Sequence, residues 1–126
     1  MSIFAKIMIA LIAILRLYIA WFGIFAWQAQ GPATFPDLPA SLFEPTAAMA
    51  ANQGVYNLCL AAGLIWSLFV RDAEWQRKVA SGFLLFVAVA GIFGAWRVSP
   101  DIALVQTRPA VIGLLLLWLP VGKMRR

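Results

Sequence analysis

Two arginines lie inside long apolar stretches of the sequence, and they are the side chains best suited to chemistry in this chain. Arg16 falls near the middle of the stretch 3–27, and Arg108 falls inside the stretch 100–119. A guanidinium group in an apolar helix turns towards polar groups, water or a ligand. One hypothesis is therefore contact with an anion or a polar headgroup. The other is a structural role, in which each arginine hydrogen-bonds carbonyls and side chains of neighbouring helices.

Amide side chains lie at a depth that matches Arg16. Gln53 and Asn57 are four residues apart, so they share one helix face. Counted from Thr46 at ~1.5 Å per residue, Asn57 lies roughly 16 Å into its helix, close to the depth of Arg16. We expect Arg16 to point inward and to hydrogen-bond Asn57. The candidate ligand-binding or polar-core residues are Arg16, Asn52, Gln53, Tyr56, Asn57, Gln106 and Arg108. The alternative is that they only hold helices together.

Most other kinds of site lack the residues that they need. The chain has no histidine and one cysteine, Cys59, in an apolar stretch. Haem, zinc, copper and iron–sulfur sites are therefore not expected, and neither are a cofactor, a metal or enzymatic activity. The five carboxylates lie at the ends of apolar stretches or between them, which argues against a proton-coupled cation exporter. They are Asp37, Glu44, Asp72, Glu74 and Asp101.

The elements that position these side chains are four apolar segments. Hydrophobic residues make up 63% of the 126 residues and mean hydropathy is +0.88, which leaves too few polar residues for the shell of a soluble domain. The predicted fold is all-α and integral to a membrane, a four-transmembrane-helix bundle in one domain, 1–126. The predicted spans are 3–27, 46–70, 79–96 and 100–119, with an external loop over 28–44.

Local signals refine these segments. Thr46 can cap the second, and Ser99-Pro100-Asp101 is typical of a helix start for the fourth, in which Pro109 predicts a kink. Ser41-Leu-Phe-Glu44 has the spacing of a capping box and allows a short interfacial helix. Gly63/Ser67 and Gly91/Ala95 have the small-residue spacing of closely packed helices.

The distribution of cations predicts the orientation. Four spans place seven of them on one side and only Arg97 and Arg108 on the other. The seven are Lys6, Arg71, Arg77, Lys78, Lys123, Arg125 and Arg126. By the positive-inside rule both termini are cytoplasmic. The net charge of +5 is then explained by topology and anionic headgroups, so the expected partner is the lipid bilayer and not nucleic acid.

The run Asn52-Gln53-Gly54-Val55-Tyr56-Asn57 and the segment that follows it resemble a family of small four-span bacterial membrane proteins, domain of unknown function 1304. The resemblance supports the fold, implies a location in the inner membrane of a bacterial cell, and implies no activity. Similar proteins carry a Glu-His pair and a further Glu in the first helix, where this chain has Leu15, Arg16 and Gly23.

Two functions follow as hypotheses. The first is a membrane bundle without enzymatic activity that serves as a structural or accessory subunit, partnered by other membrane subunits or by copies of itself. The second is a small transporter or channel for an anion or an amphiphile, which uses a polar pocket in the outer half of the bundle.

Overall fold

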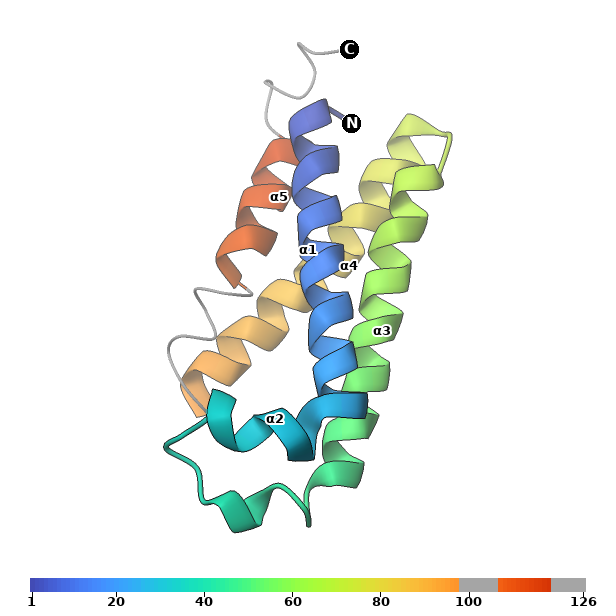
Figure 1. Cartoon of the computed structure of the whole chain (residues 1–126). Helices are drawn as coiled ribbons and strands as arrows, with labels where there is room; N and C mark the ends of the chain where they lie inside the picture. Colours follow the sequence, from blue (N-terminus) through green and yellow to red (C-terminus); the bar gives the residue numbers. More distant parts are fainter. Residues whose placement is uncertain (98–106, 119–126) are drawn as a thin grey trace. The chain divides into compact units, whose positions relative to one another are not determined.

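The computed structural model describes residues 1–97 and 107–118, and these residues form helices and connecting turns without any strand (Figure 1). The all-α prediction is therefore confirmed for this part of the chain. Two compact units can be distinguished, residues 14–61 and residues 1–13 with 62–126. Both boundaries fall inside helices, and the functional argument below concerns the unit 14–61.

The first helical stretch is longer than predicted and changes its winding on the way. Helix α1 covers Ile3–Trp21, a π-helical turn follows over Phe22–Ala26, and α2 covers Trp27–Thr34. The backbone leaves helical geometry at Ala26, with φ −121° and ψ 3°, and α2 turns away from α1 there (Figure 1). The prediction of a loop from residue 28 was wrong for residues 28–34.

Gly31 and Pro32 explain that error. Both residues usually end helices, yet Pro32 lies in the last turn of α2, where it removes one hydrogen bond only. Gly31 leaves room for the ring of Phe43, which occupies the place where a Cβ would stand. Packing of a distant aromatic ring thus sustains a helix end that local propensity does not favour.

The segment before α3 is held by side chains. A single 3₁₀ turn covers Ala40–Leu42, in place of the helix expected around Ser41–Glu44, and α3 covers Ala47–Phe69. Thr46 was predicted to cap α3 through its hydroxyl. Instead that hydroxyl donates to the carbonyl of Leu42 at 2.7 Å and accepts the indole N–H of Trp27 at 2.9 Å.

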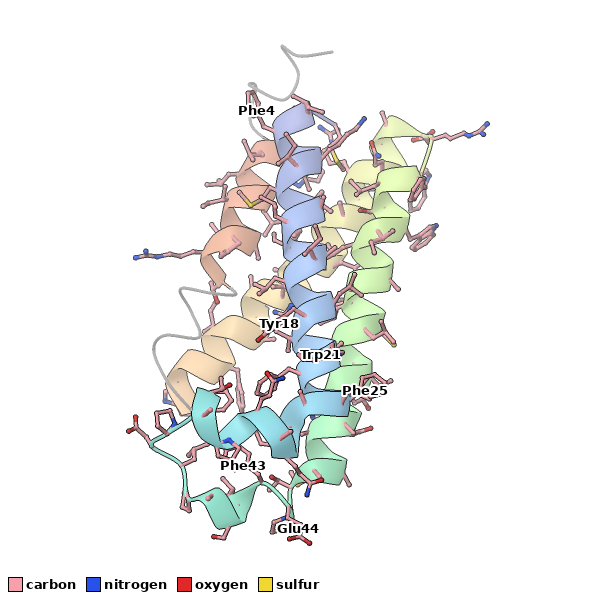
Figure 2. The ribbon with its side chains drawn as sticks, viewed as in Figure 1. Phe4, Tyr18, Trp21, Phe25, Phe43 and Glu44 are labelled. Carbon is pink, nitrogen blue, oxygen red and sulfur yellow. The ribbon has the colours of Figure 1, made fainter. Side chains whose placement is uncertain are left out.

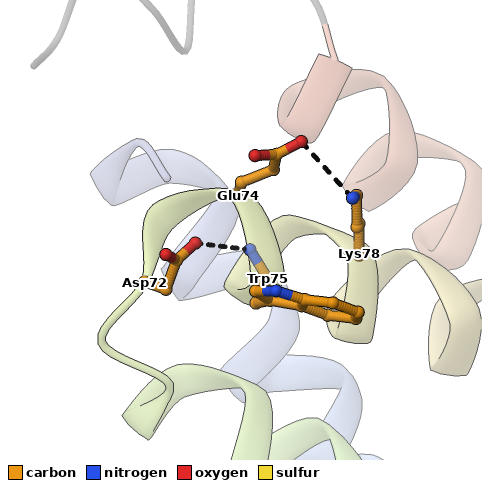
Figure 3. A network of polar contacts seen from close by, with 4 residues as sticks. All are labelled: Asp72, Glu74, Trp75 and Lys78. Carbon is orange, nitrogen blue, oxygen red and sulfur yellow. Dashed lines mark hydrogen bonds and ion pairs between the residues drawn. The ribbon is translucent and has the colours of Figure 1, made fainter.

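Helix α4 covers Ala73–Arg97, so it begins six residues earlier than the predicted span at 79. Charged residues stabilise this start, as Figure 3 shows. The Asp72 carboxylate accepts the backbone N–H of Trp75 at 3.0 Å, and Glu74 pairs with Lys78 at 3.3 Å. Carboxylates at a helix N-terminus and an i,i+4 ion pair both stabilise a helix. The residues between the second and third predicted spans therefore form the first turns of α4.

Helix α5 covers Arg108–Trp118 and packs antiparallel to α4. The hydroxyl of Thr107 donates to the Ala88 carbonyl at 3.2 Å, and the Trp118 indole donates to the hydroxyl of Ser81 at 2.8 Å. Pro109 is the second residue of α5, where a proline breaks no bond inside that helix. The predicted start at Ser99-Pro100-Asp101, the residues before the predicted Pro109 kink, and Gln106 lie outside the described residues.

Small residues mediate close packing within residues 1–13 and 62–126. Gly63 is buried and a Cβ there would overlap the ring of Phe83, while Ser67 is fully buried. The predicted packing face at Gly63/Ser67 is confirmed. Of the predicted Gly91/Ala95 face, Gly91 is also buried, and the side chain of Ala95 lies outside those that the structure describes.

Large apolar side chains cover much of the protein surface. Phe25, Phe69 and Trp96 are each at least three-quarters exposed. In the part of the chain that the structure describes, the helical stretches Ile3–Thr34 and Ala73–Phe93 are long and apolar enough to cross a membrane. Helix α3 is also long, at 23 residues, but its first half carries the polar side chains of Asn52, Gln53 and Asn57. Two of the four predicted spans thus have spanning character by length and composition.

Candidate functional site

A partly open cavity of about 420 Å³ lies within residues 14–61, between α1, the π-helical turn, α2 and α3. Its size is that of a small-molecule site, for which roughly 300–1,000 Å³ is usual. The side chains that line it are mostly aromatic or aliphatic, with a few polar groups among them. They are Tyr18, Ile19, Phe22, Gly23, Trp27, Thr34, Phe35, Thr46, Met49, Ala50, Gln53, Gly54 and Asn57.

The walls form because residues 16–27, which include the end of α1 and the π-helical turn, run antiparallel to α3 and touch it through glycines. Arg16 bonds to Asn57 and Trp27 bonds to Thr46, so residue numbers rise along one segment as they fall along the other. A Cβ on Gly23 would lie 2.7 Å from the Ala50 carbonyl oxygen, and a Cβ on Gly54 would lie 2.9 Å from that of Ala20. The two backbones are thus in contact, and the bend after Ala26 opens the space beside them.

One end of the cavity is aromatic. The Trp27 ring lies 4.9 Å from that of Phe43 and 6.0 Å from that of Phe35, between ring centroids. Phe43 comes from the segment before α3 and is almost fully buried (Figure 2). The polar atoms here are satisfied within the protein, because the Trp27 indole and the Thr46 hydroxyl bond to each other. This end therefore offers apolar contact.

The other end is polar and is built around Arg16. The Arg16 guanidinium, 4% exposed, donates through Nη1 to Oδ1 of Asn57, as predicted from their depths. Nδ2 of Asn57 donates to the Gln53 carbonyl oxygen at 3.0 Å. Arg16 itself does not line the cavity. It stands one helical turn before Ile19 on the same face, so its charge acts on the cavity through Asn57.

Two polar groups on the walls make no hydrogen bond within the described residues. They are the Tyr18 hydroxyl, on the exposed side of α1, and the Gln53 side-chain amide (Figure 2 labels Tyr18). Each can donate and accept. Together with the second N–H of Asn57, they give the cavity a set of hydrogen-bonding groups at a distance from its aromatic end.

The predicted site residues divide into two groups. Gln53, itself exposed, and the half-buried Asn57 line the cavity, and Arg16 supports it. Asn52, Tyr56 and Arg108 are also exposed but are not among the lining residues. Arg108 belongs to the other compact unit. Sequence reasoning missed Tyr18, Trp27 and the other aromatic walls. The signal available was the concentration of aromatic residues between positions 18 and 43.

No group of three or more histidine, cysteine, aspartate or glutamate side chains suited to holding a metal ion occurs in the residues described, 1–97 and 107–118. Cys59, the cysteine of an apolar stretch, is exposed on α3. The chemistry available in the cavity is therefore that of hydrogen bonds, one nearby cation and aromatic surface.

Comparison with known proteins places this geometry in a wider context. A family model described as "Protein of unknown function (DUF1304)" matches residues 10–118, a range that includes every residue lining the cavity. The chain is also similar to "Uncharacterized protein YpaA" of Lactococcus lactis subsp. lactis (strain IL1403). The two are 24% identical over 117 residues, which cover 91% of this chain and 97% of that protein. No solved structure matches significantly.

Proposed function

The chain belongs to the DUF1304 family, as its Asn52–Asn57 motif predicted, and from the geometry of its cavity we propose that it is an integral membrane protein that binds a small amphiphilic molecule. The observation that carries this proposal is the difference in chemistry between the two ends of the cavity. Aromatic rings line one end, and open hydrogen-bonding groups supported by a buried arginine line the other. A ligand with an apolar body and one polar group matches both ends.

The membrane part of the proposal rests on composition and surface. Two helical stretches have the length and apolarity of spans, and large apolar side chains such as Phe25 and Phe69 are exposed on the described surface. Lipid is the environment in which such a surface is stable. We place the protein in the inner membrane with several passes and both termini in the cytoplasm, in accordance with the excess of cations on that side.

The proposed role is binding without chemical conversion. None of the thirteen lining residues is a carboxylate, cysteine, lysine or histidine, so the walls hold none of the usual general acids, bases or nucleophiles apart from hydroxyl groups. Transport of the bound molecule, the function expected of such a pocket in a small carrier, would build on the same binding step.

A binding assay with a matched pair of variants tests the proposal. The full chain in nanodiscs of zwitterionic lipid is titrated with 2-naphthylmethanol, a small aromatic alcohol, and binding is followed by calorimetry against empty nanodiscs. We expect saturable binding at one molecule per chain. Ala50→Phe places a ring in the cavity and should abolish this binding. Ala51→Phe makes the same change at the next residue, which does not line the cavity, and should retain the binding.

A second candidate function is the structural or accessory subunit. The exposed apolar surface that favours a lipid environment also suits contact with other membrane helices. Failure of naphthalene alcohol, acid and amine to bind saturably would refute the binding proposal. Stoichiometric subunits that co-purify in mild detergent would then support the accessory role.

A further inference from the structure

We propose that the cavity selects an organic anion: an aromatic or similarly compact carboxylate whose head lies between Gln53 and Asn57, with Arg16 behind them. This inference rests on the proposed binding function and specifies the class of ligand. It assigns Arg16 as a positioning and charge-supplying residue, since the direct contacts to the carboxylate come from Gln53 and Asn57 on the cavity wall.

Within residues 14–61, the charge near the polar end of the cavity is positive. Arg16 is an ionisable side chain next to Asn57, and its guanidinium is buried. The carboxylates of the same unit, Asp37 and Glu44, are exposed in the loop that precedes α3 (Figure 2 labels Glu44). Asn57 lies eleven residues beyond Thr46, roughly 16 Å further along α3 at ~1.5 Å per residue, so these carboxylates are far from it. The field that residues 14–61 produce at this end therefore favours an anion.

The hydrogen bonds of Asn57 fix which of its atoms faces a ligand. Its Oδ1 accepts from Arg16, and one N–H of Nδ2 is used by the Gln53 carbonyl oxygen. One N–H remains, and a guanidinium bonded to the oxygen of the same amide makes that N–H a stronger donor. The Gln53 amide and the Tyr18 hydroxyl supply further donors. An array of donors beside a cation is complementary to a carboxylate and less so to an ammonium group.

The depth of the polar end separates a small acid from a membrane lipid. In the proposed topology Asn57 lies roughly 16 Å inside α3, near the middle of a ~30 Å hydrocarbon core. The aromatic end, at Trp27 and Thr46, is nearer the membrane surface. The headgroup of a bilayer lipid stays at the surface and so lies at the wrong end. The occupant is therefore a compact molecule that enters with its polar group first.

Three probes of one shape test this inference: 2-naphthoate, 2-naphthylmethanol and 2-naphthylmethylammonium, titrated into the full chain in zwitterionic nanodiscs. One charge-assisted hydrogen bond predicts that naphthoate binds about tenfold more tightly than the alcohol. The ammonium should bind more weakly than both. Equal affinities for acid and alcohol would overturn the inference while leaving the proposed binding function intact, and failure of all three probes would overturn both.

Variants with matched controls locate the preference. Asn57→Asp keeps an acceptor for Arg16 but neutralises its charge, so the preference for naphthoate should fall from about tenfold to none while the alcohol still binds. Arg16→Leu should lose the same preference. Asn52→Asp and Arg108→Leu make the same chemical changes at exposed positions outside the cavity and should keep it. Retention of the preference in folded Asn57→Asp protein would refute the assignment.

Discussion

The hydrogen bond between Arg16 and Asn57 makes an asymmetric prediction about stability. Arg16 is 4% exposed and donates to Oδ1 of Asn57. Replacing Asn57 by leucine leaves the charge without this acceptor, whereas replacing Arg16 by leucine removes the charge itself. We therefore expect Asn57→Leu to be the more harmful change, even though arginine is the larger and more conspicuous residue.

The size of the effect can be estimated from the geometry. Interhelical hydrogen bonds in membranes average ~0.6 kcal/mol with a maximum near ~1.7, and bonds to charged groups contribute about 1.5–3 kcal/mol in proteins generally. The Arg16–Asn57 bond is both interhelical and charge-assisted, so its free energy should lie where these two ranges overlap. Asn57→Leu should therefore destabilise the protein by about 1.5 kcal/mol, or about tenfold in the folding equilibrium. Arg16→Leu should be neutral or stabilising, because a central arginine costs roughly 2.5–3.5 kcal/mol to insert.

A double-mutant cycle measured by reversible unfolding in mixed micelles decides the matter. The double variant should resemble Arg16→Leu, which gives a coupling energy of about 1.5 kcal/mol. Asn52→Leu and Arg108→Leu are the controls, since both residues are exposed. A coupling energy near zero, or an Arg16→Leu variant less stable than Asn57→Leu, would refute this account of the polar end of the cavity.

Four further predictions follow from packing and charge. Gly54→Ala should destabilise the protein by about 1–3 kcal/mol in the same unfolding assay, because the added Cβ meets the Ala20 carbonyl and the Ile24 side chain. Gly82→Ala, with nothing within 4 Å of the new Cβ, should gain up to about 1 kcal/mol, and a loss there would contradict the helix-propensity argument. Gly91→Leu should lower the melting temperature or disrupt an assembly, because Gly91 is buried, and an unchanged temperature and subunit composition would place that face against lipid. Reporter fusions at residue 36 and at the C-terminus should be active outside and inside respectively, and an externally active C-terminal fusion would invert the proposed topology.

The Arg16–Asn57 contact could be predicted from the sequence because it depends mainly on the depth of each residue along its helix and on the direction of the two helices. Helix rise fixes the depth of each residue, and a chain that returns through the bilayer after one loop makes the two helices antiparallel. Residues at equal depth on adjacent helices can then be in contact. An unsatisfied guanidinium in an apolar segment is unfavourable, so a hydrogen bond from Arg16 to Asn57 was expected. The family resemblance, carried by the Asn52–Asn57 motif, was confirmed by the match over residues 10–118.

The cavity itself could not be predicted from local signals. It depends on the turn at Ala26 and on the continuation of helix through Gly31 and Pro32, where propensity favours a loop. The ring of Phe43, twelve residues further on, sustains that helix end by packing on Gly31. Contacts of this kind depend on tertiary packing, which no sequence window records. Gly23 and Gly54 are a second example. They bring two backbones into contact, but Gly23 has no small residue four positions away that would have predicted this packing.

The π-helical turn over Phe22–Ala26 has a consequence for how this chain tolerates insertions and deletions. A π-turn holds one residue more than the α-helical turn it replaces, so loss of a single residue here would restore regular winding without breaking the helix. Because the wide turn absorbs the extra residue, the side chains of α2 would keep their orientation relative to α1 after this loss. Trp27 would still face Thr46, and Gly31 would still face Phe43. A homologue shorter by one residue in this turn should therefore keep the pocket, with the change confined to the wall over Phe22–Ala26. Loss of one residue from the regular winding of α1 would instead rotate the following helix by about 100°, since an α-helix has ~3.6 residues per turn.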